Sequence, residues 1–180
     1  GYFAYATDYA TGTIFGHCGA NSDSKNIEWS LDENGVFTLS GTGAMRNYGT
    51  SSAPWDKLQA GNATIRATSL IIEEGVTTLG DYMLEFGYEI TSISLPSTLE
   101  TIGVGALRSY SSFAAMEPLV IPAGVTSIGN YAIYYNEYLT IIFEGDCPAL
   151  GSNAFYASSI SIQYRCGTKN WNQNAKYGAN

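Results

Sequence analysis

The apolar and polar residues of this chain recur at a nearly fixed spacing from about residue 70 onward. Four segments align, each starting at the end of a short apolar strand and closing on a glycine: Ile72 to Gly80, Leu95 to Gly103, Ile121 to Gly129 and Phe143 to Gly151. The closing glycines are 23, 26 and 22 residues apart. After each glycine, two residues precede a small or apolar pair: Met83-Leu84, Ala106-Leu107, Ala132-Ile133 or Ala154-Phe155. A period of this length predicts a repeat protein.

Each repeat predicts one coil of a solenoid. In the third, Leu119-Val120-Ile121 forms an apolar strand, and Pro122 ends it because proline cannot donate to a ladder. Val125 and Ile128 then point back inward, and the closing glycine permits a tight corner. Stacked coils merge their apolar faces into one core and their strands into a parallel sheet, giving a right-handed β-solenoid. A sandwich of unrelated strands would not repeat in this way.

The first 68 residues predict a different structure. Residues 27–31 and 36–40 alternate with period two around Asp32-Glu33-Asn34-Gly35, which predicts a β-hairpin with Asn-Gly in its turn. Because solenoid ends expose apolar core, caps are required. We therefore expect one continuous domain, with an N-terminal β cap over residues 1–68, four to five coils over 69–164, and a short C-terminal cap over 165–180 anchored by Trp171.

Composition narrows the classes of partner. Only 13% of the residues are charged, and the net charge is −8. The eight Lys and Arg residues do not cluster, which argues against nucleic acid and against an anionic membrane surface as partners. No run of 18 apolar residues predicts a transmembrane helix. Residues 1–6 either resemble the end of a signal peptide, through Ala4-Tyr5-Ala6, or form a frayed tail.

Catalytic and metal-binding patterns are weak. His17, the one histidine, adjoins Cys18, but neighbours on a strand point to opposite faces. Glu73-Glu74 and the Asp32-Glu33 turn favour structural hydrogen bonds over acid–base chemistry, and the turn lacks the remaining ligands of a calcium loop. Cys147 and Cys166 lie 19 residues apart, near one period, which leaves a disulfide open. We expect no catalytic site, no cofactor and no metal.

These residues resemble the BspA-like, or Treponema-type, leucine-rich-repeat family, whose pattern is roughly L-x-x-I-x-L-P-x-x-L-x-x-I-G-x-x-A-F. The similarity covers residues 69–164, and the unit from Ile90 to Leu107 fits closely. Residues 29–55 are similar to the family's capping segment, and residues 162–171 to its usual ending. Two departures occur. The Cys/Asn slot conforms only at Asn136 and holds Gly87, Tyr110 and Ser158 in the other units, and extra residues near 111–116 predict a bulging loop.

The resemblance implies a secreted or cell-surface bacterial protein, expected to be monomeric, that binds an extracellular host or microbial protein in adhesion. The residues add two candidate surfaces. Tyrosines gather in the later coils, with Tyr110 before them, and either bind a partner or fill the corners: Tyr134, Tyr135 and Tyr138. The middle residues of the strands form a row that is either a binding surface or a set of good strand formers: Ile71, Ser94, Val120 and Ile142, with Gln163 beyond. The alternatives are a structural spacer in an envelope protein, a carbohydrate-binding module and, last, an enzyme.

Overall fold

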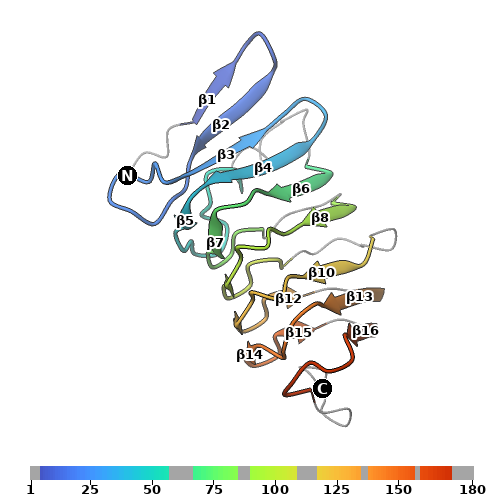
Figure 1. The fold of residues 1–180 in the computed structure, drawn as a ribbon. Coiled ribbons are helices and arrows are strands. Elements are labelled where there is room, and N and C mark those ends of the chain that lie inside the picture. Colours follow the sequence, from blue (N-terminus) through green and yellow to red (C-terminus); the bar gives the residue numbers. More distant parts are fainter. Residues whose placement is uncertain are drawn as a thin grey trace.

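The chain folds as a stack of β-coils that runs from the N-terminus to the C-terminus (Figure 1). The computed structural model describes residues 5–56, 67–84, 90–108, 117–134, 138–156 and 159–171, and only the backbone of Tyr138 and Ser159. Within them, the sixteen strands form four sheets. The parallel-strand solenoid predicted from the repeats, with its N-terminal hairpin, is confirmed.

Two sheets make the first face of the solenoid. The larger contains, in spatial order, β1 (Tyr5–Asp8), β2 (Thr13–His17), β3 (Ile27–Leu31), β4 (Val36–Gly41), β6 (Ser69–Ile72) and β8 (Ser92–Ser94). The smaller contains β10 (Leu119–Ile121), β13 (Tyr138–Phe143) and β16 (Ser159–Tyr164). From β4 onward the paired strands of this face are parallel.

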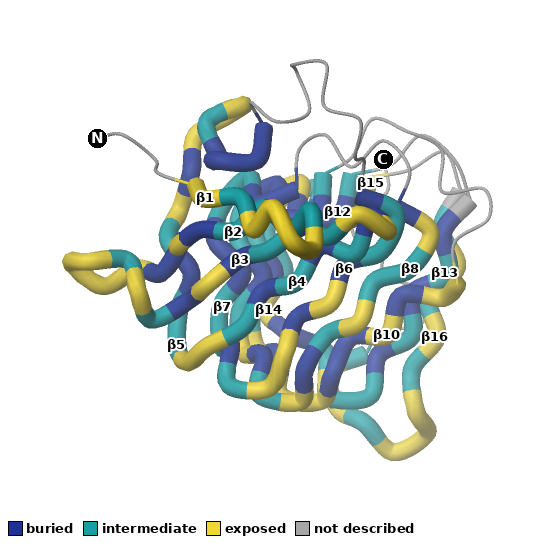
Figure 2. Tube along the Cα trace, turned by 90° about the horizontal axis from the view of Figure 1, so that it is seen from above, coloured by how far each residue is buried: buried dark blue, intermediate teal, exposed yellow. Residues whose placement is uncertain are grey.

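Two further sheets line the rest of each coil. One contains β5 (Gly43–Ala44), β7 (Val76–Leu79), β9 (Thr101–Ile102), β11 (Ser127–Ile128) and β14 (Ala149–Leu150). The other pairs β12 (Ile133–Tyr134) with β15 (Phe155–Tyr156). Buried and exposed residues alternate along the strands (Figure 2), because successive side chains of a strand point to opposite faces.

The N-terminal cap and the solenoid share one sheet. The predicted hairpin is present as β3 and β4, and the Asp32 carboxylate closes its turn by accepting the N–H groups of Asn34 (3.0 Å) and Val36 (2.8 Å). β4 then pairs in parallel with β6, the first strand beyond the cap. A second hairpin, β1–β2, was not predicted. It includes Tyr5 and Ala6 from the N-terminal segment.

Side chains from every coil join one apolar core. In the cap, Trp29 is fully buried, with its ring stacked on Phe37 (5.9 Å between centroids) and edge-on to Trp55 (5.5 Å). In the later coils, Phe143 packs edge-on against Phe155. Burying such side chains stabilises the fold by about 1.5–3 kcal/mol each, so the core is the main source of stability.

The closing glycines stack directly on one another. A Cβ added to Gly129 would lie 2.6 Å from the nitrogen of Val104 and 2.7 Å from the carbonyl carbon of Gly103, in the preceding coil. The closing glycines do not have positive φ, so the tight corner needs glycine for the missing side chain and not for a left-handed backbone. The left-handed residue comes two positions later in each coil, at Tyr82, Gly105, Tyr131 and Asn153, where φ is 50–56°. The glycine is required for close backbone approach.

Trp171 covers the C-terminal end of the stack. Its ring stacks on Tyr164 at 4.8 Å between centroids, contacts Phe143 at 4.7 Å, and its indole N–H donates to the Gly145 carbonyl (3.3 Å). The three cysteines are free thiols, so the Cys147–Cys166 disulfide that the spacing left open is not formed. The slot residues Gly87, Tyr110, Asn136 and Ser158 and the loop expected near residues 111–116 lie outside the described residues.

Candidate functional site: the outer face of the parallel sheet

The middle residues of the parallel strands form a row on the outer face. The ladder places Ile71 opposite Ser94, and Val120 opposite Ile142, which in turn lies opposite Gln163. Ile71 is 37% exposed and Val120 is 40% exposed, while their neighbours along the strand point into the core. The row therefore presents one side chain per coil to solvent, and two of its members, Ile71 and Val120, are exposed apolar residues.

The parallel sheet is interrupted between β8 and β10. These strands are neighbours, yet no ladder pair joins them among the described residues. The same two coils remain paired on the second face, where Thr101 lies opposite Ser127 and Ile102 opposite Ile128. The interruption is thus local to the outer face and does not separate the coils.

Two prolines explain the interruption. Glu144 donates its N–H to the Ile121 carbonyl of the preceding coil (3.0 Å), and every second residue of a parallel strand donates toward the same neighbour. Because Ile121 is aligned with Phe143, the equivalent positions in β10 are Pro118, Val120 and Pro122. Proline has no N–H. Two of the three donors that would join β10 to β8 are therefore missing.

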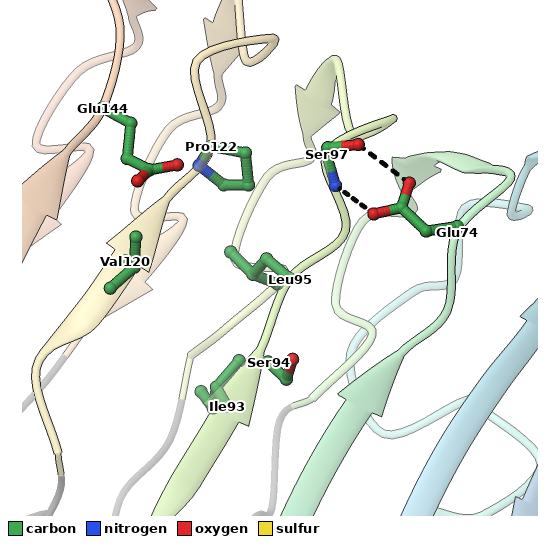
Figure 3. Close-up of a pocket in the computed structure, with 8 residues that line it drawn as sticks. All are labelled: Glu74, Ile93, Ser94, Leu95, Ser97, Val120, Pro122 and Glu144. Atoms are coloured by element: carbon green, nitrogen blue, oxygen red, sulfur yellow. Dashed lines mark hydrogen bonds between the residues drawn. The ribbon is translucent and has the colours of Figure 1, made fainter.

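A groove of about 410 Å³ lies at this interruption. Its apolar lining consists of Ile93, Leu95, Val120 and Pro122, and its polar lining of Ser94, Ser97, Glu74 and Glu144. Figure 3 shows Glu74 and Glu144 on opposite sides of Leu95 and Pro122. The groove thus contains two residues of the predicted row, Ser94 and Val120, while Ile71 and Ile142 do not line it.

Both charged residues of the groove are carboxylates. Glu74 accepts hydrogen bonds from the next coil, namely from the Ser97 N–H (2.8 Å), the Ser97 hydroxyl (3.0 Å) and the Thr98 N–H (3.3 Å). These bonds lower the pKa of Glu74, the Ser97 N–H most, and keep it ionised. Glu144 forms an exposed ion pair with Arg165 (2.9 Å). The groove is therefore acidic at two points of its rim.

The later tyrosines form a separate column on the β12–β15 edge. The rings of Tyr134 and Tyr156 stack at 4.9 Å between centroids with an interplanar angle of 7°, and the Arg108 guanidinium lies 5.1 Å from the Tyr134 ring centroid. Tyr134 is half-buried in this stack. Tyr135 and Tyr110 lie outside the described residues, as does the side chain of Tyr138. The column is thus distinct from the sheet row.

Two features of these surfaces were missed from the sequence although a signal existed. Arg108, Tyr134 and Tyr156 each follow a closing glycine by five residues, so the repeat itself aligned them. Pro118 lies four residues before Pro122, so the backbone nitrogens of both residues face the same neighbouring strand. Whether that strand belongs to the preceding or the following coil is known only from the register of the neighbouring strands.

The residues considered for catalysis do not come together. His17 is exposed and Cys18 is buried, as their adjacent positions on and after β2 require. Burial raises the pKa of the Cys18 thiol to about 12, which keeps it protonated and unreactive. Among the described residues, no group of three or more His, Cys, Asp and Glu side chains is arranged to hold a metal ion.

The repeat matches a known family of leucine-rich repeats. The family model described as "BspA type Leucine rich repeat region" matches residues 62–174 in six copies. The chain belongs to the BspA-type leucine-rich-repeat family. The resemblance noted over residues 69–164 is confirmed and extended at both ends. BspA-type repeats are protein-interaction modules and typically non-catalytic, and they are commonly associated with the cell surface.

A solved structure of a leucine-rich repeat protein has a similar fold. It is a leucine-rich repeat protein from Eubacterium ventriosum ATCC 27560, determined at 2.50 Å, with a TM-score of 0.56 and 24% sequence identity. The match covers 86% of this chain but only 41% of that protein, so this chain spans about two fifths of its length. Comparison with curated proteins gives no significant match. In the described part of this BspA-type chain, no helix is long and apolar enough to cross a membrane.

Proposed function

We propose that this chain is a non-catalytic recognition module of a secreted or surface-displayed bacterial protein, and that it binds a host or microbial protein through the outer face of its parallel sheet. The observation that carries the proposal is the row from Ile71 to Ile142, with exposed apolar side chains at Ile71 and Val120 beside a groove. Apolar side chains presented in line next to a concavity are a feature of protein interaction sites.

The shape of the surface supports this assignment. The row lies on strands whose backbone is fixed by ladders to the neighbouring coils and whose inner side chains are buried in the core. A partner would therefore meet a surface that needs little reorganisation, which reduces the entropic cost of binding. The repeat also spaces equivalent side chains regularly, which suits an extended contact.

A comparison of three proteins in one capture experiment tests the proposal. The wild type, the double variant Ile71→Asn/Val120→Asn and the control Ala149→Asn are immobilised and exposed to an extracellular-matrix extract. Ala149 is an exposed apolar residue on the second face, in β14, so its variant makes the same kind of change elsewhere. Circular dichroism melts show that all three proteins are folded.

We expect partner proteins that are retained by the wild type and by Ala149→Asn and lost from the double variant. Equal retention by all three proteins, or no specific retention by the wild type, would contradict the proposal. The location of the chain is tested separately by antibody labelling of intact cells of the source bacterium. Labelling only after lysis would contradict surface display.

Carbohydrate binding is a second candidate because of one observation. Tyr156 ends the stacked pair with Tyr134, and it is 39% exposed. An exposed aromatic ring fixed by a stacking partner offers a face to a sugar ring. Binding on a glycan array that is lost in Tyr156→Ala and kept in Ile71→Asn/Val120→Asn would favour this candidate over the sheet face.

A further inference from the structure

The interrupted sheet leaves a backbone acceptor in the groove. In an unbroken ladder the Leu95 carbonyl would accept the N–H of residue 122, by the pattern that joins Glu144 to Ile121. Pro122 cannot donate, and no hydrogen bond to the Leu95 carbonyl occurs among the described residues. A carbonyl without a donor favours a ligand that brings N–H groups.

The two carboxylates give the groove its charge preference. Glu74 is fully exposed and held ionised by the three bonds from the next coil, with its pKa lowered below the ordinary value. Glu144 lies across the groove, and Arg165, its ion-pair partner, is itself 67% exposed. With a net charge of −8 on the chain, the field around the groove attracts cations and repels anionic or phosphorylated segments.

The apolar surface between the two carboxylates, called the apolar floor below, determines which kind of cationic side chain fits the groove. Ile93, Leu95, Val120 and Pro122 separate the two acidic points (Figure 3). Lys and Arg side chains lay their aliphatic stems on apolar surface and keep the charged head at a polar rim. In an extended segment, an apolar residue two positions from the basic one would contact the same floor. An extended segment suits the site, since the groove runs beside two strands and alternate side chains of a strand share one face.

We infer that the groove between β8 and β10 binds an extended peptide segment of the partner protein that carries a lysine or arginine two positions away from an apolar residue. The apolar floor holds the stem and that apolar side chain, Glu74 and Glu144 receive the cationic head, and the Leu95 carbonyl accepts a hydrogen bond. This inference rests on the proposed function, because it specifies the chemistry of the partner for the same sheet face.

Three peptides that differ at two positions test the inference. Their sequence is Ser-Xaa-Thr-Val-Thr-Xaa-Tyr, acetylated and amidated, with lysine, serine or glutamate at both Xaa positions, so that the valine and both Xaa side chains share one face of the extended peptide. Binding to the full chain is measured by isothermal titration at about 0.05 M and about 0.3 M salt, between which surface charges become strongly screened. The variants are Val120→Asn and Glu74→Gln/Glu144→Gln. The matched control Glu28→Gln/Glu33→Gln removes two exposed acids of the cap.

We expect the lysine peptide to bind more tightly than the serine peptide, and the glutamate peptide not to bind. Affinity for the lysine peptide should fall about fivefold or more in the double groove variant and stay unchanged in the cap control. The affinity of the wild type for this peptide should also fall when the salt concentration is raised. Equal binding of all three peptides, no binding of the lysine peptide, or binding that Val120→Asn and the groove variant leave unchanged would overturn the inference. The capture experiment with Ile71→Asn/Val120→Asn is independent of peptide charge, so the proposed function can survive any of these results.

Discussion

Replacing Gly129 by alanine should destabilise the solenoid strongly, although it adds a single methyl group. The added Cβ would lie 2.6 Å from the Val104 nitrogen and 2.7 Å from the Gly103 carbonyl carbon. Both are backbone atoms of the preceding coil, so no side-chain rotation can relieve the contact. Either the coils separate or the Gly129 N–H loses its 2.8 Å hydrogen bond to the Ile102 carbonyl.

The size of the effect follows from these contacts. Overpacking a close-packed site costs about 1–3 kcal/mol, and a lost hydrogen bond about 0.5–1.5 kcal/mol. Alanine recovers about 0.4–1 kcal/mol, because it restricts the unfolded chain more than glycine does. Taking the middle of each range, we expect the free energy of unfolding to fall by about 2 kcal/mol. Urea denaturation followed by tryptophan fluorescence and circular dichroism measures it.

Two control substitutions separate close approach from backbone strain. A Cβ at Gly49 would lie 3.5 Å from the Ser52 hydroxyl oxygen, so Gly49→Ala should change stability by less than about 0.5 kcal/mol. Gly105 has a φ of +56°, so Gly105→Asn should be tolerated better than Gly105→Ala, since asparagine adopts this conformation more readily. At Gly129 both residues should be equally damaging. A loss below about 1 kcal/mol for Gly129→Ala would refute the explanation by backbone approach.

The cap, the buried thiol and the sheet interruption each give one further prediction. Trp171→Ala should cost about 1–3 kcal/mol, because the half-buried ring loses its contacts with Tyr164 and Phe143, and it should speed hydrogen exchange in β16; unchanged exchange would argue against the cap. Cys18 should react with a thiol reagent only on unfolding, whereas exposed Cys166 reacts in the folded protein. Because burial raises the Cys18 pKa from 9.0 to about 12, the unfolded thiol ionises first, so stability should fall between pH 9 and 12 and fall less in Cys18→Ala; equal pH profiles would contradict this. Pro118→Ser/Pro122→Ser restores two donors toward β8 and should slow exchange of the Val120 amide and weaken lysine-peptide binding, while an unchanged groove would mean that the prolines do not cause the interruption.

Much of the fold could be predicted because the repeat constrains every coil in the same way. The spacing of the glycines and the apolar strand residues fixed which side chains enter the core, and Trp171 was recognisable as an anchor because an open solenoid end must be covered. The β1–β2 hairpin was missed, since the exposed and half-exposed residues of Tyr5–Asp8 and Thr13–His17 lack the strong alternation that marks β3 and β4.

The candidate site could be predicted only in part. The row through Ile71 and Val120 follows from strand periodicity, but the groove beside it depends on contacts between coils. Pro122 signals the end of a strand, yet only the alignment of Ile121 with Phe143 shows that it also removes a donor toward β8. From the sequence, Glu74 looked like an ordinary acidic residue of a turn. Its hydrogen bonds with Ser97 of the next coil could not be predicted, because they depend on how the coils stack in register.

A hydrogen-exchange footprint of the lysine peptide on the wild-type chain tests the proposed binding face most directly. Bound peptide should slow exchange of the amides in β8 and β10 and at Glu144, which line the groove, and leave β12 and β15 unchanged. Protection confined to the β12–β15 edge, or to the cap, would place binding elsewhere and contradict recognition through the outer face of the parallel sheet.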